Sequence, residues 1–418
     1  MLNFKDFIKE DFNKEDLLLE AESSSVESDD KGKLHELLLA KYLHPEEKLP
    51  EHHRSFSDNP DHAGTPEQVH DKLKEKIPPA AYNEIDKHAR QSADAFRQSL
   101  KDQGQLNDNT HIGNVHWTSN ADKPNKPGDH FKTVKDAQGN GVSDPNSNAD
   151  LIITLKDKEG KTVGYHGISA KYGSQEPNYR NPGLDALEKT AKLPSGSLAA
   201  PMQHHTDAME KLGYTGSADQ RNIQTKIDEM DMKDIRQKHA EGLAAIQAGK
   251  KLSGKKKIMH EHLEKFIQSH DALPASKQQA LLQQAKLRAE TARASNLAAR
   301  TQMTQSFAAG LAQHKPEELA NIIRQNVSPN THIPHTVVHS KVKDSGEAES
   351  VIKPMHSLAD EHLAQFKPDS LHVVPGKGTS VTIKGIHAKT GKPVVAARYT
   401  IKSSSGAHKS AVGTFKLQ

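Results

Sequence analysis

The sequence predicts a mixed protein of the α/β (α+β) class, and three stretches of the chain support this prediction. Residues 149 to 174, ADLIITLKDKEGKTVGYHGISAKYGS, place two β-rich runs around the polar turn KDKEGK, a pattern typical of a hairpin. Residues 199 to 327 are rich in Ala, Gln, Lys and Glu and predict a long helical region. From residue 332 the chain changes again, and SLHVV, SVTIKGIHA, KPVVAARYTIK and SAVGTFKL predict strands.

The chain before the hairpin predicts helices joined by irregular segments. KLHELLLAKYL predicts one helix, and residues 66 to 100 predict two more, which Pro78 and Pro79 separate. The last of these helices has an apolar side formed by Tyr82, Ile85, Ala89, Ala93 and Phe96. Trp117, the single tryptophan, lies in NVHWTSN and predicts one short strand.

These patterns divide the chain into four segments. Residues 1 to 30 form an amphipathic leader and a disordered tether, and residues 31 to 198 form a core around the hairpin. Residues 199 to 330 form the helical region, and residues 331 to 418 form a β-rich tail. The tail either completes the sheet of the core or forms a module of its own.

Composition excludes several classes of site. The 418 residues include no cysteine, which rules out disulfides, thiolate zinc sites and cysteine nucleophiles and fits a reducing compartment. No stretch predicts a membrane span. The 57 basic and 54 acidic side chains nearly balance, so any contact with nucleic acid must come from local basic patches. With 33% hydrophobic and 4% aromatic residues, we expect modest cores joined by polar stretches.

The hairpin brings polar residues together at its open end. A turn centred at Lys158 and Glu159 places Asp150 opposite Ser169, with Cβ atoms roughly 5 Å apart. Ser169 and Lys171 are two residues apart on one strand, so their side chains leave the same face. Asp150, Ser169 and Lys171 are therefore expected to converge. An unpaired lysine beside a strand covered on both faces is costly, and a functional role explains it.

These residues resemble the signature of the PD-(D/E)xK nucleases, an Asp that opens one strand and (Glu/Asp)-x-Lys on the next. Asn148-Ala149-Asp150 and Ser169-Ala170-Lys171 match it in spacing and setting. The resemblance implies a restriction endonuclease-like core that hydrolyses DNA phosphodiester bonds with Mg²⁺ (or Mn²⁺). It implies that Asp150 binds the metal and that Lys171 positions or activates the water. Ser169 departs from the pattern, because the family usually has an acidic metal ligand there.

The resemblance also suggests where further carboxylates come from. Some restriction endonucleases with Ser-x-Lys take the missing carboxylate from a helix slightly downstream, and Glu188 in LDALEKTAK is similarly placed as a metal ligand. Family members often carry a Glu on the helix before the core. Here Glu36 and Glu84 both fit, and the sequence leaves the choice open. Gln175, in KYGSQ, is a further candidate for a DNA or metal contact.

A cluster of lysines in the helical region is a candidate for contact with the DNA backbone. The run GKKLSGKKK nearly spells a phosphate-binding P-loop, but it lacks the final Ser or Thr and follows a helical stretch. We interpret it as a basic linker between helices whose side chains bind phosphates. Its lysines are Lys250, Lys251, Lys255, Lys256 and Lys257.

The first residues carry a second resemblance. MLNFKDFIKE and DLLLEAE look like the capsid-targeting leader of T-even phage internal head proteins, which the prohead protease removes after Leu-x-Glu or Ile-x-Glu. Leu18-Leu19-Glu20 precedes the small residue Ala21, and Ile8-Lys9-Glu10 is an earlier match. The resemblance implies the capsid and the protease as partners. It also implies a protein of the virion head interior that enters the host cytoplasm after injection.

Two alternatives stay open. The leader could be an ordinary amphipathic helix that docks on its own protein, which would leave a cytoplasmic protein. The whole chain could also be a non-enzymatic internal head protein that binds DNA or capsid, with an inactive nuclease-like fold. Cleavage of plasmid DNA in the presence of a divalent metal separates the enzyme from the structural protein.

Overall fold

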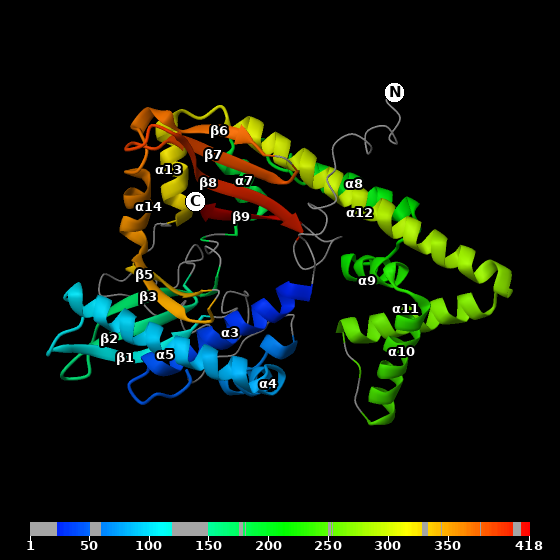
Figure 1. Cartoon of the computed structure of the whole chain (residues 1–418), viewed down its shortest axis with the longest axis horizontal. Helices are drawn as coiled ribbons and strands as arrows, with labels where there is room; N and C mark the ends of the chain where they lie inside the picture. Colours follow the sequence, from blue (N-terminus) through cyan, green and yellow to red (C-terminus); the bar gives the residue numbers. More distant parts are fainter. Residues whose placement is uncertain are drawn as a thin grey trace. The chain divides into compact units, whose positions relative to one another are not determined.

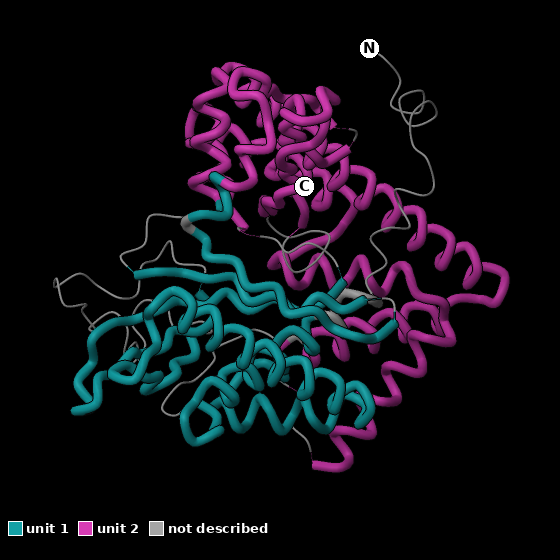
Figure 2. The backbone as a smooth tube through the Cα atoms, turned by 60° about the vertical axis from the view of Figure 1, so that its left-hand side comes forward, with its two compact units in different colours: residues 1–177, 327–360 teal, residues 178–326, 361–418 magenta. Residues whose placement is uncertain are grey.

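A computed structural model describes residues 23–50, 60–118, 149–174, 179, 181–249, 252, 254–327, 333–343, 345–376, 378–403 and 411–418. The chain divides into two compact units (Figure 2). Unit 1 comprises residues 1–177 and 327–360, and unit 2 comprises residues 178–326 and 361–418. The segment predicted as one β-rich tail is therefore shared between the units.

Unit 1 is built on a five-stranded sheet with the order β1-β2-β3-β4-β5. Figure 1 labels its strands β1, β2, β3 and β5. Its strands are β1 (Thr110–Trp117), β2 (Leu151–Asp157), β3 (Thr162–Gly173), β4 (His335–Val342) and β5 (Ala348–Pro354). The pairs β1–β2, β2–β3 and β4–β5 are antiparallel, and β3–β4 is parallel. The predicted hairpin is thus β2–β3, and two strands from far along the chain extend its sheet.

In the described part of unit 1, the sheet is preceded and accompanied by the α-helices α3 (Ser23–Leu43), α4 (Pro66–Lys76) and α5 (Pro79–Asp102). α4 begins at a capping box in which the Thr65 side chain accepts from the backbone of Gln68, and α5 begins at a proline. The predicted break at Pro78 and Pro79 is confirmed. A single apolar cluster joins α3 and α5 to one face of the sheet, and it includes Leu34, Leu37, Leu38, Ile85, Ala89, Ala93, Phe96, Trp117, Leu151, Ile153 and Ile168.

The start of α3 differs from the prediction. Residues 23–30 were expected to form a polar tether, but they make the first turns of α3. The helix is anchored farther along by Leu34, Leu37 and Leu38, all fully buried, and tertiary packing of this kind stabilises a helix beyond its apolar stretch.

Both faces of β2 are covered, as the sequence predicts. Leu151, Ile153 and Leu155 belong to the cluster under α3 and α5. Ile152 points the other way, into a small cluster with Ala149 and Ile333 against which Tyr165 packs. The open end of the hairpin is therefore held from both sides.

Unit 2 contains the predicted helical region and a second sheet. Its helices are α7 (Leu184–Thr190), α8 (Ala200–Lys211), α9 (Ala218–Glu229), α10 (Met232–Gln247), α11 (Gly254–Asp271), α12 (Ala275–Leu311) and α13 (Pro316–Val327). α14 (Met355–Leu363) spans the boundary between the units. The second sheet is antiparallel, with β6 (His372–Pro375), β7 (Ser380–Ile386), β8 (Pro393–Ser403) and β9 (Ala411–Leu417) in that order.

The mixed α/β class, the long helical region and the β-rich C-terminal segment are thereby confirmed. The four strands predicted after residue 370 are β6 to β9. Within the described part of the chain, no helix has the length and hydropathy needed to cross a membrane.

Candidate active site

The hairpin register sets the position of Asp150. Leu151 pairs with Ile168, and the backbone N–H of Asp150 donates to the carbonyl of Ile168 at 2.8 Å. Asp150 therefore lies directly before β2, opposite Ser169 on β3, as the turn position predicts. Alternation along β3 then turns Ser169 and Lys171 toward the same face.

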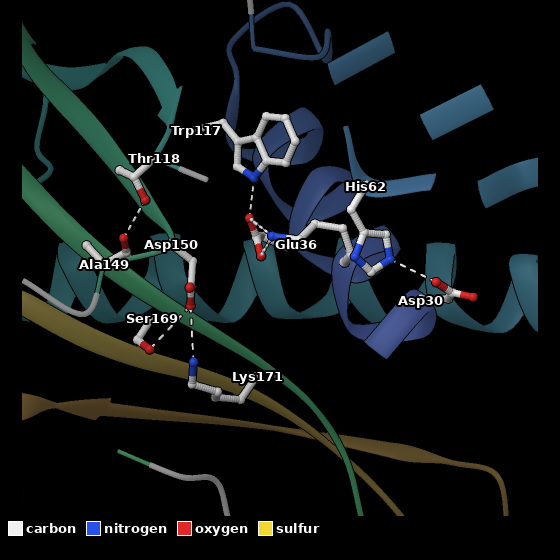
Figure 3. A network of polar contacts seen from close by, with 10 residues as sticks. Asp30, Glu36, His62, Trp117, Thr118, Ala149, Asp150, Ser169 and Lys171 are labelled. Carbon is white, nitrogen blue, oxygen red and sulfur yellow. Dashed lines mark hydrogen bonds and ion pairs between the residues drawn. The ribbon is translucent and has the colours of Figure 1, made fainter. Parts of the chain in front are cut away.

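The three side chains meet at one carboxylate oxygen (Figure 3). Asp150 Oδ2 lies 3.2 Å from Lys171 Nζ and 3.3 Å from Ser169 Oγ, and both side chains donate to it. Ser169 is buried, whereas the side chains of Asp150 and Lys171 are 29% and 28% exposed. The ion pair is thus partly open to solvent, whereas Ser169 beside it is buried.

Glu36 supplies a second carboxylate beside Asp150 (Figure 3). It lies on α3, is buried, and accepts hydrogen bonds from Lys33 Nζ at 2.8 and 3.0 Å and from the indole N–H of Trp117. Burial raises the pKa of Glu36, Lys33 acts in the opposite direction, and the negative charge of Asp150 raises the pKa further. Two neighbouring carboxylates, one of them buried, favour neutralisation by a proton or by a cation.

Lys33 and Trp117 were not predicted as part of a site. Lys33 Nζ lies 5.3 Å from the centroid of the Trp117 ring, so both groups that hold Glu36 also contact each other. The spacing of three residues between Lys33 and Glu36 on a predicted helix was the available signal for this pair. Nothing in the sequence links Trp117 to Glu36, because the two residues are brought together only by the packing of α3 on β1.

The donor set of Asp150 and Glu36 fits a hard divalent cation. Mg²⁺ prefers oxygen ligands and is usually bound through one or two carboxylates together with water and substrate phosphate. Neither described contact of Asp150 uses Oδ1. Among the described residues, no group of three or more His, Cys, Asp or Glu side chains is arranged to hold a metal. A metal here would therefore depend on two carboxylates and on the substrate.

Glu84 and Glu188 have other surroundings. Glu84 is exposed on α5. Burial, together with the negative charge of Glu84, raises the pKa of Tyr172 to about 12. Glu188 lies in unit 2, buried on α7, and its two oxygens accept from the backbone N–H groups of Gly196 at 2.8 Å and Leu198 at 2.7 Å. This carboxylate fixes the chain after α7, and the role of Glu188 as a metal ligand stays a prediction.

Several predicted residues lie outside the described residues: Glu20, Ala21, Gln175, Lys250 and Lys251. Of the remaining linker lysines, Lys255 is described only as part of α11, and Lys256 and Lys257 are exposed on the same helix. Lys257 Nζ lies 3.8 Å from Glu261. The roles predicted for these residues stay predictions.

A buried polar network lies under the helices on the same sheet. His35 on α3 shares a hydrogen bond of 2.7 Å with Ser340 on β4, and Ser92 on α5 bonds to Ser340 at 2.6 Å and Ser350 at 2.9 Å. The Nδ1 atom of His35 is buried with no hydrogen-bond partner among the described residues. Burial, assisted by the charges of His88 and His339, lowers the pKa of His35 from 6.5 to about 3.

We expect this histidine to make unit 1 sensitive to acid. Because burial lowers the pKa of His35 in the folded protein, only the unfolded chain binds a proton at this histidine between pH 6.5 and pH 3. The contribution of neutral His35 to the free energy of unfolding is therefore complete above pH 6.5 and is lost as the pH falls toward 3. Between pH 7 and pH 5 the loss is about 2 kcal/mol of unfolding free energy. Urea unfolding at several pH values should show a smaller loss for His35→Gln than for wild type. The exposed His111→Gln is the control, and parallel curves for wild type and His35→Gln would contradict the assignment.

No protein-family model matches the chain, and no curated protein matches it. Among solved structures, the chain is similar to the restriction endonuclease MspI in complex with its cognate DNA, with a TM-score of 0.30 and 11% sequence identity over 82% of each chain. The chemistry of the site depends on the side chains described above.

Proposed function

We propose that unit 1 is a metal-dependent nuclease that hydrolyses DNA phosphodiester bonds. The observation that carries the proposal is the meeting of Asp150, Lys171 and Ser169 at the open end of β2–β3, beside the buried carboxylate of Glu36. A buried acid with a raised pKa next to a partly exposed carboxylate and a lysine is a frequent mark of catalytic sites. A purely structural ion pair does not require the second carboxylate.

Each residue has a role in hydrolysis. Asp150 and Glu36 would hold the cation, Mg²⁺ or Mn²⁺, which when bound polarises the phosphate and makes its water more acidic. Lys171 Nζ, now 3.2 Å from Asp150, can donate to a phosphate oxygen or steer the attacking water. Water adds to phosphorus and loses a proton, and the P–O bond to the leaving oxygen breaks as that oxygen gains one. Ser169 orients the Asp150 carboxylate through its hydroxyl.

Conversion of supercoiled plasmid DNA to nicked and linear forms tests the proposal. We expect cleavage with Mg²⁺ or Mn²⁺ and none with EDTA. If the purified protein cuts no DNA or RNA with either metal, the non-enzymatic internal head protein becomes the better interpretation. The lysine cluster of the helical region is predicted independently to bind phosphates, so replacing its lysines with Gln should flatten the salt dependence of DNA binding: Lys250, Lys251, Lys255, Lys256 and Lys257.

We further propose that the protein is packaged in a phage head through its first 20 residues. The support is the leader-like sequence that ends at Leu18-Leu19-Glu20 and precedes Ala21, which lies outside the described residues. The mature chain in particles should begin at Ala21. Intact-mass measurement of virion-derived protein decides the matter, and a chain that retains Met1 to Glu20 would contradict packaging while leaving the nuclease proposal unaffected.

A further inference from the structure

The sheet of unit 2 has two chemically different faces. One face carries Val381, Ile383, Ala397, Tyr399, Ile401 and Phe415, all buried. It packs on α12, where the ring of Phe307 lies 5.0 Å from the ring of Tyr399. Residues alternate between faces along a strand, so the opposite face presents the intervening positions of β7, β8 and β9.

The opposite face is basic. On β8, Arg398 and Lys402 are exposed, and the cross-strand partner of Arg398 on β9 is Lys416. On the β7 side, Arg398 pairs with Thr382. Lys384 is two positions beyond Thr382 on β7, so its side chain leaves the same face of the sheet. We call these four cations the basic sheet face (β6 to β9 in Figure 1).

The sequence that forms this sheet and its loops contains no acidic residue. Residues 370 to 418 include no Asp or Glu, although they include Lys377, Lys384, Lys389, Lys392, Arg398, Lys402, Lys409 and Lys416. Within the described residues, no Asp or Glu forms an ion pair with Lys384, Arg398 or Lys402. The whole chain is nearly neutral, so this face concentrates positive charge that a polyanion can neutralise.

The other residues of the face favour the backbone of a duplex. Thr400, half-buried between Arg398 and Lys402 on β8, adds a hydroxyl group, and hydroxyl groups together with Lys and Arg are common donors to phosphate. Single-stranded nucleic acid is instead bound by sheets through aromatic rings on which bases stack. The aromatic rings of β8 and β9, Tyr399 and Phe415, are on the buried face.

We propose that the basic sheet face of unit 2 binds the phosphate backbone of duplex DNA without regard to base sequence. The choice of DNA rests on the proposed function of unit 1, but binding here needs no divalent metal. The face would hold the substrate independently of the catalytic residues. It would add affinity that falls as salt rises, since each phosphate contact releases counterions.

A triple variant, Lys384→Gln, Arg398→Gln and Lys402→Gln, tests the proposal in the full chain. Binding to a labelled duplex is measured in EDTA over a range of salt concentrations. The slope of log K against log salt should become less steep by about 2 to 3, since each lost phosphate contact contributes about 0.9. The control replaces Lys233, Lys238 and Lys277 with Gln, because these lysines of unit 2 are exposed on α10 and α12 and the charge change is equal. It should keep the wild-type slope.

Equal slopes for the triple variant and wild type would overturn the proposal, and so would equal reductions in the triple variant and its control. Tighter binding to single-stranded DNA or RNA than to the duplex would overturn the choice of duplex. If the triple variant melts early, the single variant Lys402→Glu, at an exposed position, should still reduce the slope. If wild type binds DNA in EDTA but never cuts it with metal, the nuclease proposal is refuted and the proposal for the basic sheet face stands. If wild type cuts DNA with metal but does not bind it in EDTA, the proposal for the basic sheet face is refuted and the nuclease proposal stands.

Discussion

Asp150→Asn and Lys171→Ala should each lower the rate of metal-dependent DNA cleavage by about a hundredfold to a thousandfold. Asp150→Asn removes the charge that would hold the cation, and Lys171→Ala removes the donor 3.2 Å from that carboxylate. Both groups act on charge that develops in the transition state, so their loss removes several kcal/mol of stabilisation. Plasmid cleavage at saturating Mg²⁺ measures the effect.

The fold should survive both changes. The two side chains are 29% and 28% exposed, and a partly exposed ion pair contributes at most about 1 kcal/mol to stability. Thermal melts of the variants should therefore stay close to wild type. Lys158→Ala, at the exposed turn of the same hairpin, is the matched control and should cut normally. A Lys171→Ala protein that cuts as well as wild type means that the catalytic assignment is wrong.

Glu36→Gln should also eliminate cleavage, and it should make the metal-free protein more stable at neutral pH. The pKa of Glu36 in the folded protein is raised above its ordinary value of 4.5. The contribution of protonated Glu36 to the free energy of unfolding is therefore complete below pH 4.5 and is lost as the pH rises through the folded pKa. At neutral pH this raised pKa therefore makes buried Glu36 destabilising for the metal-free fold. The neutral amide removes this cost and keeps an oxygen that can accept from Trp117.

Melting temperatures with and without Mg²⁺ separate this prediction from a simple loss of stability. Mg²⁺ should raise the Tm of wild type, because a ligand that binds only the folded state stabilises it. It should not raise the Tm of Glu36→Gln, whose metal-free Tm should exceed that of metal-free wild type. Metal titrations should also change the fluorescence of Trp117, the single tryptophan, which donates to Glu36.

Glu84→Gln is the matched control, since this glutamate is exposed on α5 in the same unit. It should keep both cleavage and the metal response. If Glu84→Gln loses them while Glu36→Gln keeps them, the choice left open by the sequence falls to Glu84. Glu188→Gln should lower stability, because the amide keeps one acceptor oxygen and loses one of the two bonds to Gly196 and Leu198, and it should leave the metal response intact.

Local sequence was sufficient for the hairpin and for the geometry of its polar residues. A two-residue period, a polar turn and covered faces determine which residues of β2 and β3 are opposite each other. The observed pairing of Leu151 with Ile168 follows from these local features. The helices α4 and α5 were predictable for the same reason, because prolines and a continuous apolar side define where they begin and which side is buried.

Strands β4 and β5 were not predicted, and the reason is their composition. β4 buries polar residues, among them Thr336, His339 and Ser340, so it lacks the alternation of apolar and polar residues that marks a strand. Their burial is tolerated because hydrogen-bond partners come from other elements, as His35 and Ser92 do for Ser340. Such partners are invisible until the fold brings them together.

The sequence by itself determined that Asp150, Ser169 and Lys171 meet, because all three belong to one hairpin whose pairing is local. Only the tertiary structure decided which distant carboxylate joins them. Glu36 and Glu84 both lie on helices before the hairpin, and the packing of α3 against β1 places Glu36 beside Trp117 and Asp150. A contact between residues far apart in the chain depends on how whole helices and strands pack. The apolar periodicity of α3 and α5 shows which side of each helix is buried, but it does not show which strand each helix packs against.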